Sequence, residues 1–328
     1  MSAISSAAPL LLFESDVSRF LTMPDAINAV EAAFIAQARG EASNHPRERF
    51  FMPSGVLHHM AAAWPGRLGG GVMGTKTYTS FAAGTRFWVQ LFSADTGDLL
   101  ALIEADRLGR MRTGAATGVA ARHLARKNAA TAALLGTGGQ ARTQARALAA
   151  ACPTLQRIVA FGRDEERRRA FCREMTDTLG GVPVLPANSV EEAVRDAQIV
   201  VCATTAREPI LKGREHLAPG TFVAAVGANR LTAREIDEEV VGRADVIVVD
   251  DVAQARAESA ELVFAHERRT FAWEKARSLA SVVAGHALGR TSDDEIILFK
   301  SLGVALEDVA VAAFVYEEAR AANAGRNL

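Results

Sequence analysis

The sequence predicts an α/β protein in which a doubly wound parallel sheet is joined to an α+β region formed by the first third of the chain. Six short apolar segments alternate with stretches of helical character, which is typical of parallel strands linked by crossover helices. These segments are 132–135, 158–161, 182–185, 198–203, 222–226 and 246–249. Ahead of them, apolar runs at 87–92 and 99–103 flank a turn rich in Asp and Gly, which predicts an antiparallel hairpin.

The first of the six segments runs into a glycine-rich turn. Residues 132–141 read AALLGTGGQA, an apolar strand followed by G-x-G-x-x-A and the start of a helix. Gly136 permits a sharp turn, Gly138 lets backbone N–H groups approach a pyrophosphate, and Ala141 allows the helix to pack close to the strand. Together with the alternating strands and helices, this motif predicts a Rossmann-type dinucleotide-binding domain.

The end of the second strand bears on the choice of cofactor. NAD-specific folds place a carboxylate there, on the ribose hydroxyls. This strand ends in Gly162-Arg163-Asp164. The missing acid at Gly162 and the guanidinium of Arg163 favour a 2′-phosphate, and therefore NADP(H) over NAD(H), although Asp164 lies close enough to weaken this preference.

Composition and charge exclude several classes of partner. The chain has 328 residues, 49% of them apolar, and a net charge of -1, so nothing attracts it globally to nucleic acid or to an anionic membrane. No apolar stretch reaches the roughly 20 residues of a membrane span, and the N-terminus lacks the basic start of a signal peptide. Cys152, Cys172 and Cys202 show no metal-type spacing, and we expect them to be reduced and buried in a cytoplasmic protein with a small-molecule partner.

Charged residues of the first third are candidates for chemistry. Arg47 and Arg49 lie near aromatic residues, either on a solvated strand edge or as a clamp for a substrate carboxylate. Lys76 lies between Thr75 and Thr77 in a predicted strand, so the lysine and the threonines face opposite sides. A strand lysine usually faces solvent, but one that closely follows a run of glycines is a candidate for catalysis.

A helix of small residues is predicted from Arg110 to about Arg126, which puts Arg112 and Thr113 in its first turn. A positive charge at that end opposes the helix dipole. We therefore expect an anion to bind there, with Arg112 as its ligand.

Two other features are expected to carry no chemistry. The segment 250–269 has mixed charge and is predicted to form a solvated helix. His45, His58 and His59 do not predict a metal site, because adjacent residues of a strand point to opposite faces.

Taken together, these motifs resemble the ornithine cyclodeaminase and mu-crystallin family over nearly the whole chain. The matching stretches are Pro46-Arg47, the strand of Lys76, MRTGA at 111–115, the fingerprint with Gln140 and Ala141, ATT at 203–205, FKSLG at 299–303 and LED at 306–308. The resemblance implies a Rossmann domain, residues 121–300, inserted into a substrate-binding and dimerisation domain formed by residues 1–120 and 301–328. It also implies a homodimer.

The resemblance implies roles for individual residues as well. The family moves hydride between a nicotinamide and the α-carbon of an amino acid or its imine. An arginine of the Arg47–Arg49 segment and Arg112 would then hold the substrate carboxylate, Lys76 would act at the reacting group, and Leu302 would approach the substrate. Combined with the motifs above, the cofactor-binding set is Arg112, Thr113, Gly136, Thr137, Gly138, Gly139, Gln140, Ala141, Gly162, Arg163, Thr204, Val226, Gly227, Ala228 and Ser301.

One position departs from the family's pattern. Cyclodeaminases carry an aspartate after the fifth strand, where this chain has Asn229. An amide cannot take a proton at neutral pH, so the general base for ring closure with loss of ammonia is missing. A lysine found a few positions further on in cyclodeaminases is also absent, because the chain reads Thr232-Ala233-Arg234.

These observations predict an NAD(P)H-dependent reductase that acts on the C=N bond of small 2-imino acids and yields L-amino acids. Candidate substrates are a cyclic ketimine such as Δ1-pyrroline-2-carboxylate, or iminosuccinate, whose second carboxylate suits two arginines. Three alternatives stay open: an ornithine cyclodeaminase that uses other groups, an alanine-type dehydrogenase, and a protein that binds NADP(H) and a small ligand without turnover, as mu-crystallin does.

Overall fold

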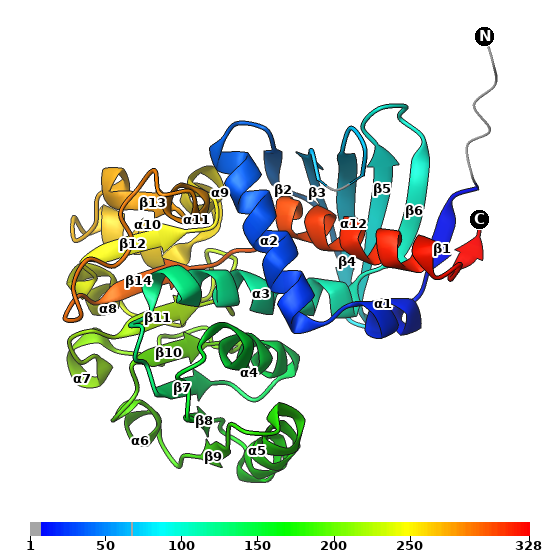
Figure 1. The fold of residues 1–328 in the computed structure, drawn as a ribbon. Coiled ribbons are helices and arrows are strands. Elements are labelled where there is room, and N and C mark those ends of the chain that lie inside the picture. The colour runs from blue at the N-terminus through cyan, green and yellow to red at the C-terminus, as the bar shows by residue number, and fades with distance from the viewer. Residues whose placement is uncertain (1–7, 67) are drawn as a thin grey trace. The chain divides into compact units, whose positions relative to one another are not determined.

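The computed structural model describes residues 8–66 and 68–328, and the chain forms two compact units. The first unit comprises Met1–Arg112 and Val304–Leu328, and the second comprises Thr113–Gly303. The boundary falls inside helix α3 (Asp106–Leu124), between Arg112 and Thr113. Figure 1 labels the helices and strands of both units.

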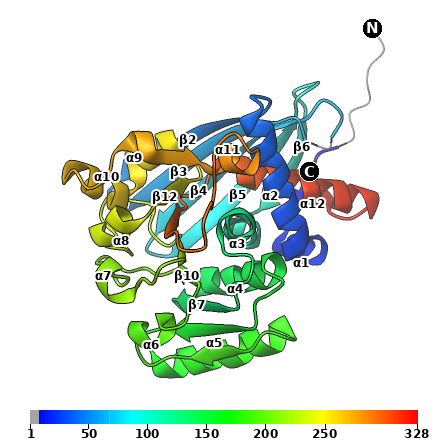
Figure 2. The same ribbon diagram turned by 60° about the vertical axis from the view of Figure 1, so that its left-hand side comes forward.

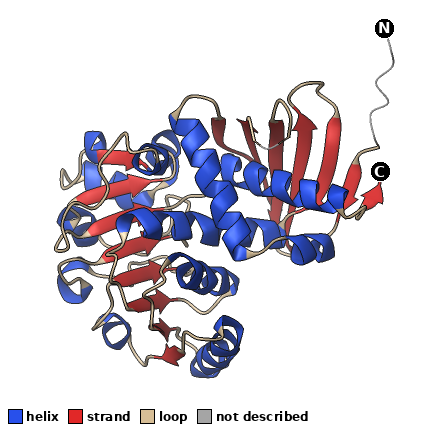
Figure 3. Cartoon of the chain, viewed as in Figure 1, coloured by secondary structure: helices blue, strands red, loops and turns tan. Residues whose placement is uncertain are grey.

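The first unit is built on a seven-stranded sheet in the order β15-β1-β6-β5-β4-β3-β2. Its strands are β1 (Leu10–Leu12), β2 (Ser43–Met52), β3 (Gly55–Trp64), β4 (Val72–Phe81), β5 (Gly84–Ser93), β6 (Leu99–Glu104) and β15 (Arg326–Asn327). Neighbouring strands are antiparallel except β1 and β6, and β5 and β6 form the predicted hairpin. Besides α3, the helices are α1 (Glu14–Phe20), α2 (Met23–Ala38) and α12 (Ala305–Ala321), and α12 crosses β2 to β5 with α2 beside it (Figure 3).

Side chains alternate along β4 as predicted. Lys76 pairs with Met60 of β3 and Val89 of β5 on the buried face, and its threonine neighbours lie on the other face. The usual solvent-facing position of a strand lysine does not apply, because Lys76 is only 2% exposed. Gly74 lies on the same buried face, where an added Cβ would be 2.8 Å from Val309 Cγ2 of α12. Helix α12 therefore packs closely on this part of the sheet.

The second unit is the predicted doubly wound sheet, with eight parallel strands in the order β13-β12-β14-β11-β10-β7-β8-β9. The strands are β7 (Thr131–Leu135), β8 (Arg157–Phe161), β9 (Val184–Pro186), β10 (Ile199–Cys202), β11 (Phe222–Ala225), β12 (Val246–Val249), β13 (Ala276–Ser278) and β14 (Ile297–Lys300). The helices are α4 (Gly139–Ala151), α5 (Glu165–Leu179), α6 (Val190–Val194), α7 (Gly213–His216), α8 (Glu238–Arg243), α9 (Val252–Glu258), α10 (Ala260–Glu267), η1 (Trp273–Lys275) and α11 (Leu279–Val283). Helices α4 and α5 lie on one face of the sheet, and α6 and α7 lie on the other (Figures 1 and 2).

The register of this sheet brings its functional loops to one edge. Four residues pair side by side across β7, β10, β11 and β14, namely Leu135, Cys202, Ala225 and Lys300. Because the strands are parallel, the segments that follow them leave the sheet together. We call this side the carboxyl edge, and ligands of doubly wound sheets bind outside it.

Three sequence predictions were wrong. Helix α3 begins at Asp106 and not at Arg110, so Arg112 and Thr113 lie in its second turn, and the argument from the helix dipole does not apply. The segment 250–269 forms two helices, α9 and α10, in which Glu258 and Glu261 are buried rather than solvated. Strands β13 and β14 were missed, although β14 lies between β11 and β12 inside the sheet.

Two further expectations concern the cysteines and membrane spans. Cys152, Cys172 and Cys202 are buried and free, as predicted. Over residues 8–66 and 68–328, no helix combines the length and the apolar character that crossing a bilayer requires.

The close packing of α12 makes Gly74 sensitive to substitution. We expect Gly74→Ala to lower the free energy of unfolding by about 1–3 kcal/mol, because the new methyl group meets Val309 and the carbonyl oxygen of Gln90. Gly242→Ala in α8 is the control, since a Cβ there contacts nothing within 4 Å. Urea unfolding measures both, and a Gly74→Ala protein as stable as wild type would contradict this packing.

Candidate active site

The predicted catalytic lysine lies in a buried ionic cluster of the first unit. Lys76 Nζ donates a hydrogen bond to Asp308 Oδ1 at 2.7 Å, and both side chains are almost fully buried. The site has little spare room, because a Cβ added at Gly109 of α3 would lie 3.0 Å from Lys76 Nζ. Strand β4, helix α3 and helix α12 thus meet around one ammonium group.

Arg112 of α3 binds the same carboxylate. Its Nε donates to Asp308 Oδ1 at 3.1 Å, and its Nη1 donates to Glu307 Oε2 at 2.7 Å. Arg112 is therefore paired with two carboxylates of α12. We call Lys76, Arg112, Glu307 and Asp308 the lysine cluster.

The surroundings of Lys76 bring its pKa closer to neutral pH. Burial lowers the pKa of Lys76 from 10.5 to about 8, since an ammonium group loses its hydration there. Asp308 opposes this shift, and the positive charges of Arg112 and Arg47 reinforce it. A lysine with a pKa of about 8 can both give and take a proton near physiological pH.

The two arginines of β2 occupy different surroundings. Arg47 is 9% exposed, and its charge acts on Lys76. The charge of Arg49 acts on His58, and burial together with Arg49 and then Arg47 lowers the pKa of His58 to about 4. Arg47 therefore belongs to the surroundings of the lysine cluster, and His58 is neutral at pH 7.

An aromatic stack follows the same face of the sheet. The His58 ring stacks on Tyr78 with centroids 4.1 Å apart, and Tyr78 stacks on Phe87 at 5.0 Å. Lys76 Nζ lies 5.4 Å from the centre of the Phe87 ring and 5.9 Å from that of Tyr78. Flat, uncharged surfaces thus adjoin the lysine cluster.

The ion pairs of the lysine cluster balance. With Lys76 protonated, Lys76 and Arg112 contribute two positive charges, and Glu307 and Asp308 contribute two negative charges. Asp308 Oδ2 is also buried, with no hydrogen-bond partner in the described part of the chain. This acceptor oxygen suits a ligand that brings an N–H group.

The sequence analysis assigned no role to Glu307 and Asp308, although they belong to the LED stretch. A signal for them was present. The surrounding helix is apolar on nearly all sides, and adjacent acids inside such a helix must be buried and paired with cations.

The glycine-rich turn of the second unit fits a dinucleotide. Gly136 has φ +117°, and an added Cβ there would lie 2.3 Å from the carbonyl oxygen of Ala203. Gly138 is the N-cap of α4 and supplies no side-chain cap, and a Cβ there would meet nothing within 4 Å. Open space beside the uncapped N–H groups of a 13-residue helix is the cradle that a pyrophosphate requires.

The end of β8 has no room for an acidic side chain. A Cβ added at Gly162 would lie 2.7 Å from Thr137 Oγ1. Arg163 is exposed, and Asp164 caps α5 by accepting a hydrogen bond from the N–H of Arg167 at 2.9 Å. The carboxylate of Asp164 is thus engaged at a helix start, and the guanidinium of Arg163 faces solvent.

The other predicted residues of the second unit lie in loops after β10, β11 and β14. Thr204 follows β10, the stretch 226–229 follows β11, and Ser301 and Leu302 follow β14. Ala228 accepts a hydrogen bond from Lys300 Nζ at 2.6 Å, and Ser301 donates one to Asp250 at 3.2 Å. Asn229 is half-buried. The structure thus gathers these residues at the carboxyl edge, whereas Arg47, Arg49, Lys76 and Arg112 belong to the first unit.

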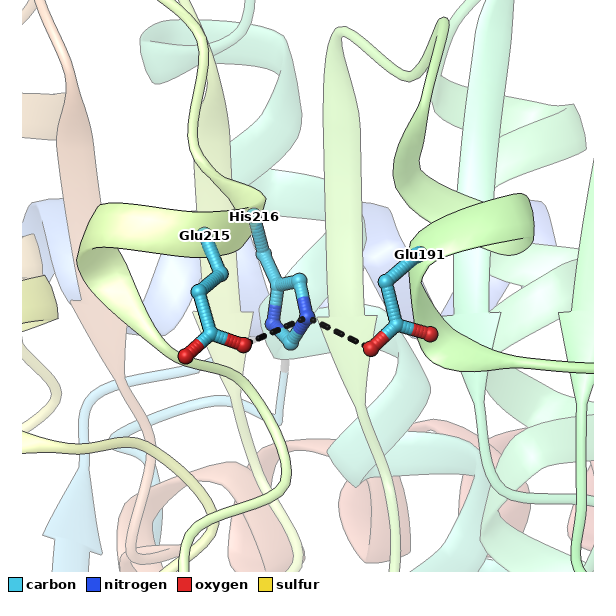
Figure 4. Close-up of side chains that lie close together, drawn as sticks. All are labelled: Glu191, Glu215 and His216. Carbon is cyan, nitrogen blue, oxygen red and sulfur yellow. Dashed lines mark hydrogen bonds and ion pairs between the residues drawn. The ribbon is translucent and has the colours of Figure 1, made fainter.

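A group of metal-type side chains also occurs in the second unit, at Glu191, Glu215 and His216 (Figure 4). The buried His216 ring accepts the Lys212 N–H at Nδ1, at 2.9 Å. A neutral imidazole that accepts at Nδ1 carries its proton on Nε2, and Nε2 lies 3.4 Å from Glu191 Oε1. The ring therefore acts as a hydrogen-bond donor that links α7 to α6.

The fold and the site define a Rossmann-type protein whose second unit has an open cradle at a helix start and whose first unit holds a buried cluster of paired charges around a lysine. The chain belongs to the ornithine cyclodeaminase/mu-crystallin family, which it matches over residues 8–323.

Several relatives are enzymes that are named for imino or amino acids. The Δ1-pyrroline-2-carboxylate reductase of Bacillus cereus is 35% identical over 232 residues, 70% of each chain. The structure of the Thermococcus litoralis Δ1-pyrroline-2-carboxylate reductase in complex with NADH and L-proline has a TM-score of 0.90 and 31% identity, over 97% of this chain and 100% of that one. An archaeal alanine dehydrogenase dimer with bound NAD also has a TM-score of 0.90, with 32% identity over 98% and 99% of the two chains.

The lowered pKa of Lys76 couples stability to pH. The pKa is about 8 in the folded protein and 10.5 ordinarily, so the unfolded chain binds more protons between these values. The free energy of unfolding therefore rises with pH across this window, by up to about 3 kcal/mol from this group. Urea unfolding at several pH values should show this rise in wild type relative to Lys76→Met, and parallel curves for the two proteins would contradict it.

Proposed function

We propose that this chain is an NAD(P)H-dependent reductase of small 2-imino acids that produces L-amino acids. The observation that carries the proposal is the buried lysine cluster, in which Lys76 and Arg112 share the carboxylate of Asp308 and the pKa of Lys76 is about 8. The open cradle at Gly138 supports a nicotinamide dinucleotide, which supplies the hydride when bound. The relatives described above reduce an imine or interconvert an amino acid, which supports the same class of reaction.

The proposed chemistry adds one hydride and one proton across C=N. Arg47 and Arg112 hold the substrate carboxylate by charge-assisted hydrogen bonds. Lys76 donates a proton to the imine nitrogen, and the buried Oδ2 of Asp308 accepts the N–H that results. The iminium carbon then accepts the hydride, which leaves a C–H bond and an amine.

Two observations bear on which imine is reduced. The rings of His58, Tyr78 and Phe87 form a flat, uncharged stack, and the centres of the Tyr78 and Phe87 rings lie within 6 Å of Lys76 Nζ. A flat surface of this kind favours a cyclic ketimine such as Δ1-pyrroline-2-carboxylate. Arg49 adds a positive charge beside His58. That charge favours a second carboxylate, as in iminosuccinate, which we keep as the second candidate.

The alternatives differ in the observations that support or oppose them. Ornithine cyclodeamination needs a base that Asn229 cannot provide. An alanine-type dehydrogenase would form its imine from pyruvate and ammonia at the same cluster, and an archaeal relative is such an enzyme. A protein that only binds NADP(H) and a ligand has no need of a buried lysine with a pKa near 8.

We further propose a cytoplasmic homodimer formed through the sheet face opposite Lys76. Alternation and register place five exposed apolar side chains on that face, namely Phe50, Met52, Leu57, Met73 and Phe81. An apolar patch of this kind is typical of an interface, and the archaeal alanine dehydrogenase is described as a dimer. The free, buried cysteines favour a reducing compartment.

The first test is a substrate panel read by oxidation of NADPH and NADH. We expect turnover of Δ1-pyrroline-2-carboxylate or iminosuccinate, and a loss of about a hundredfold or more in Lys76→Met, because the proton donor is gone. Cofactor affinity should be unchanged in that variant. Lys275→Met, which alters an exposed lysine of the second unit, should behave as wild type.

Other outcomes on this panel decide among the alternatives. Conversion of ornithine to proline without imine reduction would reject the proposal. Turnover only with pyruvate and ammonia would identify an alanine-type dehydrogenase. Tight cofactor binding with no turnover of any substrate would identify a binding protein.

The second test concerns the nucleotide. We propose NADP(H) as the preferred cofactor, because the end of β8 offers Arg163 and no available carboxylate. Arg163→Ser should lower the ratio of kcat/KM for NADPH to that for NADH by about tenfold or more, since a bond to a charged phosphate is lost. Arg169→Ser, which breaks a surface pair with Glu165, is the control. An unchanged ratio in Arg163→Ser would contradict this preference.

A further inference from the structure

A buried carboxylate joins two of the loops at the carboxyl edge. Glu235, in the segment between β11 and α8, has no exposed surface. Its Oε1 accepts hydrogen bonds from the N–H of Thr204 at 2.6 Å and from Thr204 Oγ1 at 2.8 Å. Its Oε2 accepts one from the N–H of Gly227 at 2.6 Å. One side chain thus connects the loop after β10 to the loop after β11.

The backbones of these loops also approach each other closely. A Cβ at Gly227 would lie 2.3 Å from the carbonyl oxygen of Thr204 and 2.5 Å from Glu235 Oε1. A Cβ at Gly136 would lie 2.3 Å from the carbonyl oxygen of Ala203, next in the chain to Thr204. Backbone contacts therefore run from the glycine-rich turn, through the loop after β10, to Gly227.

Burial raises the pKa of Glu235, and the positive charge of Lys300 and the hydrogen bonds from Thr204 and Gly227 oppose this shift. Lys300 Nζ lies 3.4 Å from Glu261 Oε1 and donates to the carbonyl oxygen of Ala228, and Glu261 Oε1 accepts the N–H of Glu235 at 3.2 Å. Buried ionic groups contribute little net stability, and where they are kept they often select one conformation. Two of the three groups that donate to Glu235 are backbone N–H groups, so its carboxylate fixes the backbone of both loops.

We propose that Glu235 is a positioning residue for cofactor binding. Its side chain holds the loops of Thr204 and Gly227 in the conformation that receives the nicotinamide half of the dinucleotide. The inference rests on the proposed function, in which this chain binds NAD(P)H. The pyrophosphate half depends instead on the glycine-rich turn and the start of α4. Loss of the Glu235 carboxylate therefore weakens binding of the nicotinamide half and leaves binding of the pyrophosphate half unchanged.

The test compares the preferred nucleotide with its fragment that lacks nicotinamide, which is ADP-ribose, or its 2′-phosphate if NADPH is preferred. In Glu235→Gln, one acceptor oxygen becomes an NH₂ group that faces a backbone N–H. We expect the Kd for the whole nucleotide to rise about ten- to hundredfold, and the Kd for the fragment to stay within about twofold. Hydride transfer in a single turnover should slow as well.

Controls separate positioning from a general loss of structure. Glu208→Gln removes a carboxylate that is 85% exposed in the segment after β10, and it should leave both Kd values unchanged. If Glu235→Gln does not fold, Thr204→Val removes only the hydroxyl bonds of that residue and should shift the same ratio in the same direction, by a smaller factor. Thermal unfolding with and without each ligand gives a second readout that needs no turnover.

The outcomes are distinct. An equal rise in both Kd values, or no change in either, overturns the role of Glu235 and leaves the proposed function standing. A wild-type protein that binds neither ligand overturns the proposed function and this inference with it. A selective loss for the whole nucleotide supports the positioning role even if none of the imines is reduced.

Discussion

The hydrogen bond between Lys76 and Asp308 is the constraint around which the first unit is organised. It joins a strand to a helix that lies 232 residues later in the chain. An ammonium group can be buried in this way only if a carboxylate is buried with it, because an isolated charge loses its hydration without compensation. Gly74 and Gly109 provide the room for this pair, the first by letting α12 approach the sheet and the second by leaving space beside Nζ. Arg112 then joins the same carboxylate, so three elements share one oxygen atom.

The two units use buried charge in different ways. In the first unit, the cations Lys76 and Arg112 pair with the side-chain carboxylates of Asp308 and Glu307. In the second unit, Asp250 accepts the N–H groups of Leu302 and Gly303, each at 2.6 Å, and Glu235 accepts those of Thr204 and Gly227. These carboxylates are satisfied by backbone and therefore fix the shape of loops. The charges of the first unit thus pair side chain with side chain, whereas these carboxylates of the second unit pair with backbone.

Local patterns in the sequence were sufficient for the parts of the fold that depend on neighbouring residues. The glycine-rich turn and the alternation around Lys76 are of this kind. The start of α3 was misplaced because its cap comes from far away, where the Glu14 carboxylate accepts the N–H of Asp106 at 2.7 Å across 92 residues of sequence. Glu235 and Asp308 were missed for the same reason, since their partners lie 31 and 232 residues away. Contacts between residues so far apart in the sequence produce no periodic pattern. The only local signal for them is an acidic residue in an otherwise apolar segment.

Asn229 limits the chemistry of the proposed enzyme. An amide neither takes nor gives a proton at neutral pH, so Asn229 cannot activate water or assist a departing amine. In the proposed reaction, proton transfer falls to Lys76 and Asp308, which offer one ammonium donor and one buried acceptor oxygen. One donor and one acceptor suffice to protonate an existing C=N bond and hold the product, but ring closure with loss of ammonia requires further proton transfers. The exchange of an acid for an amide thus favours a reductase that receives its substrate as a preformed imine.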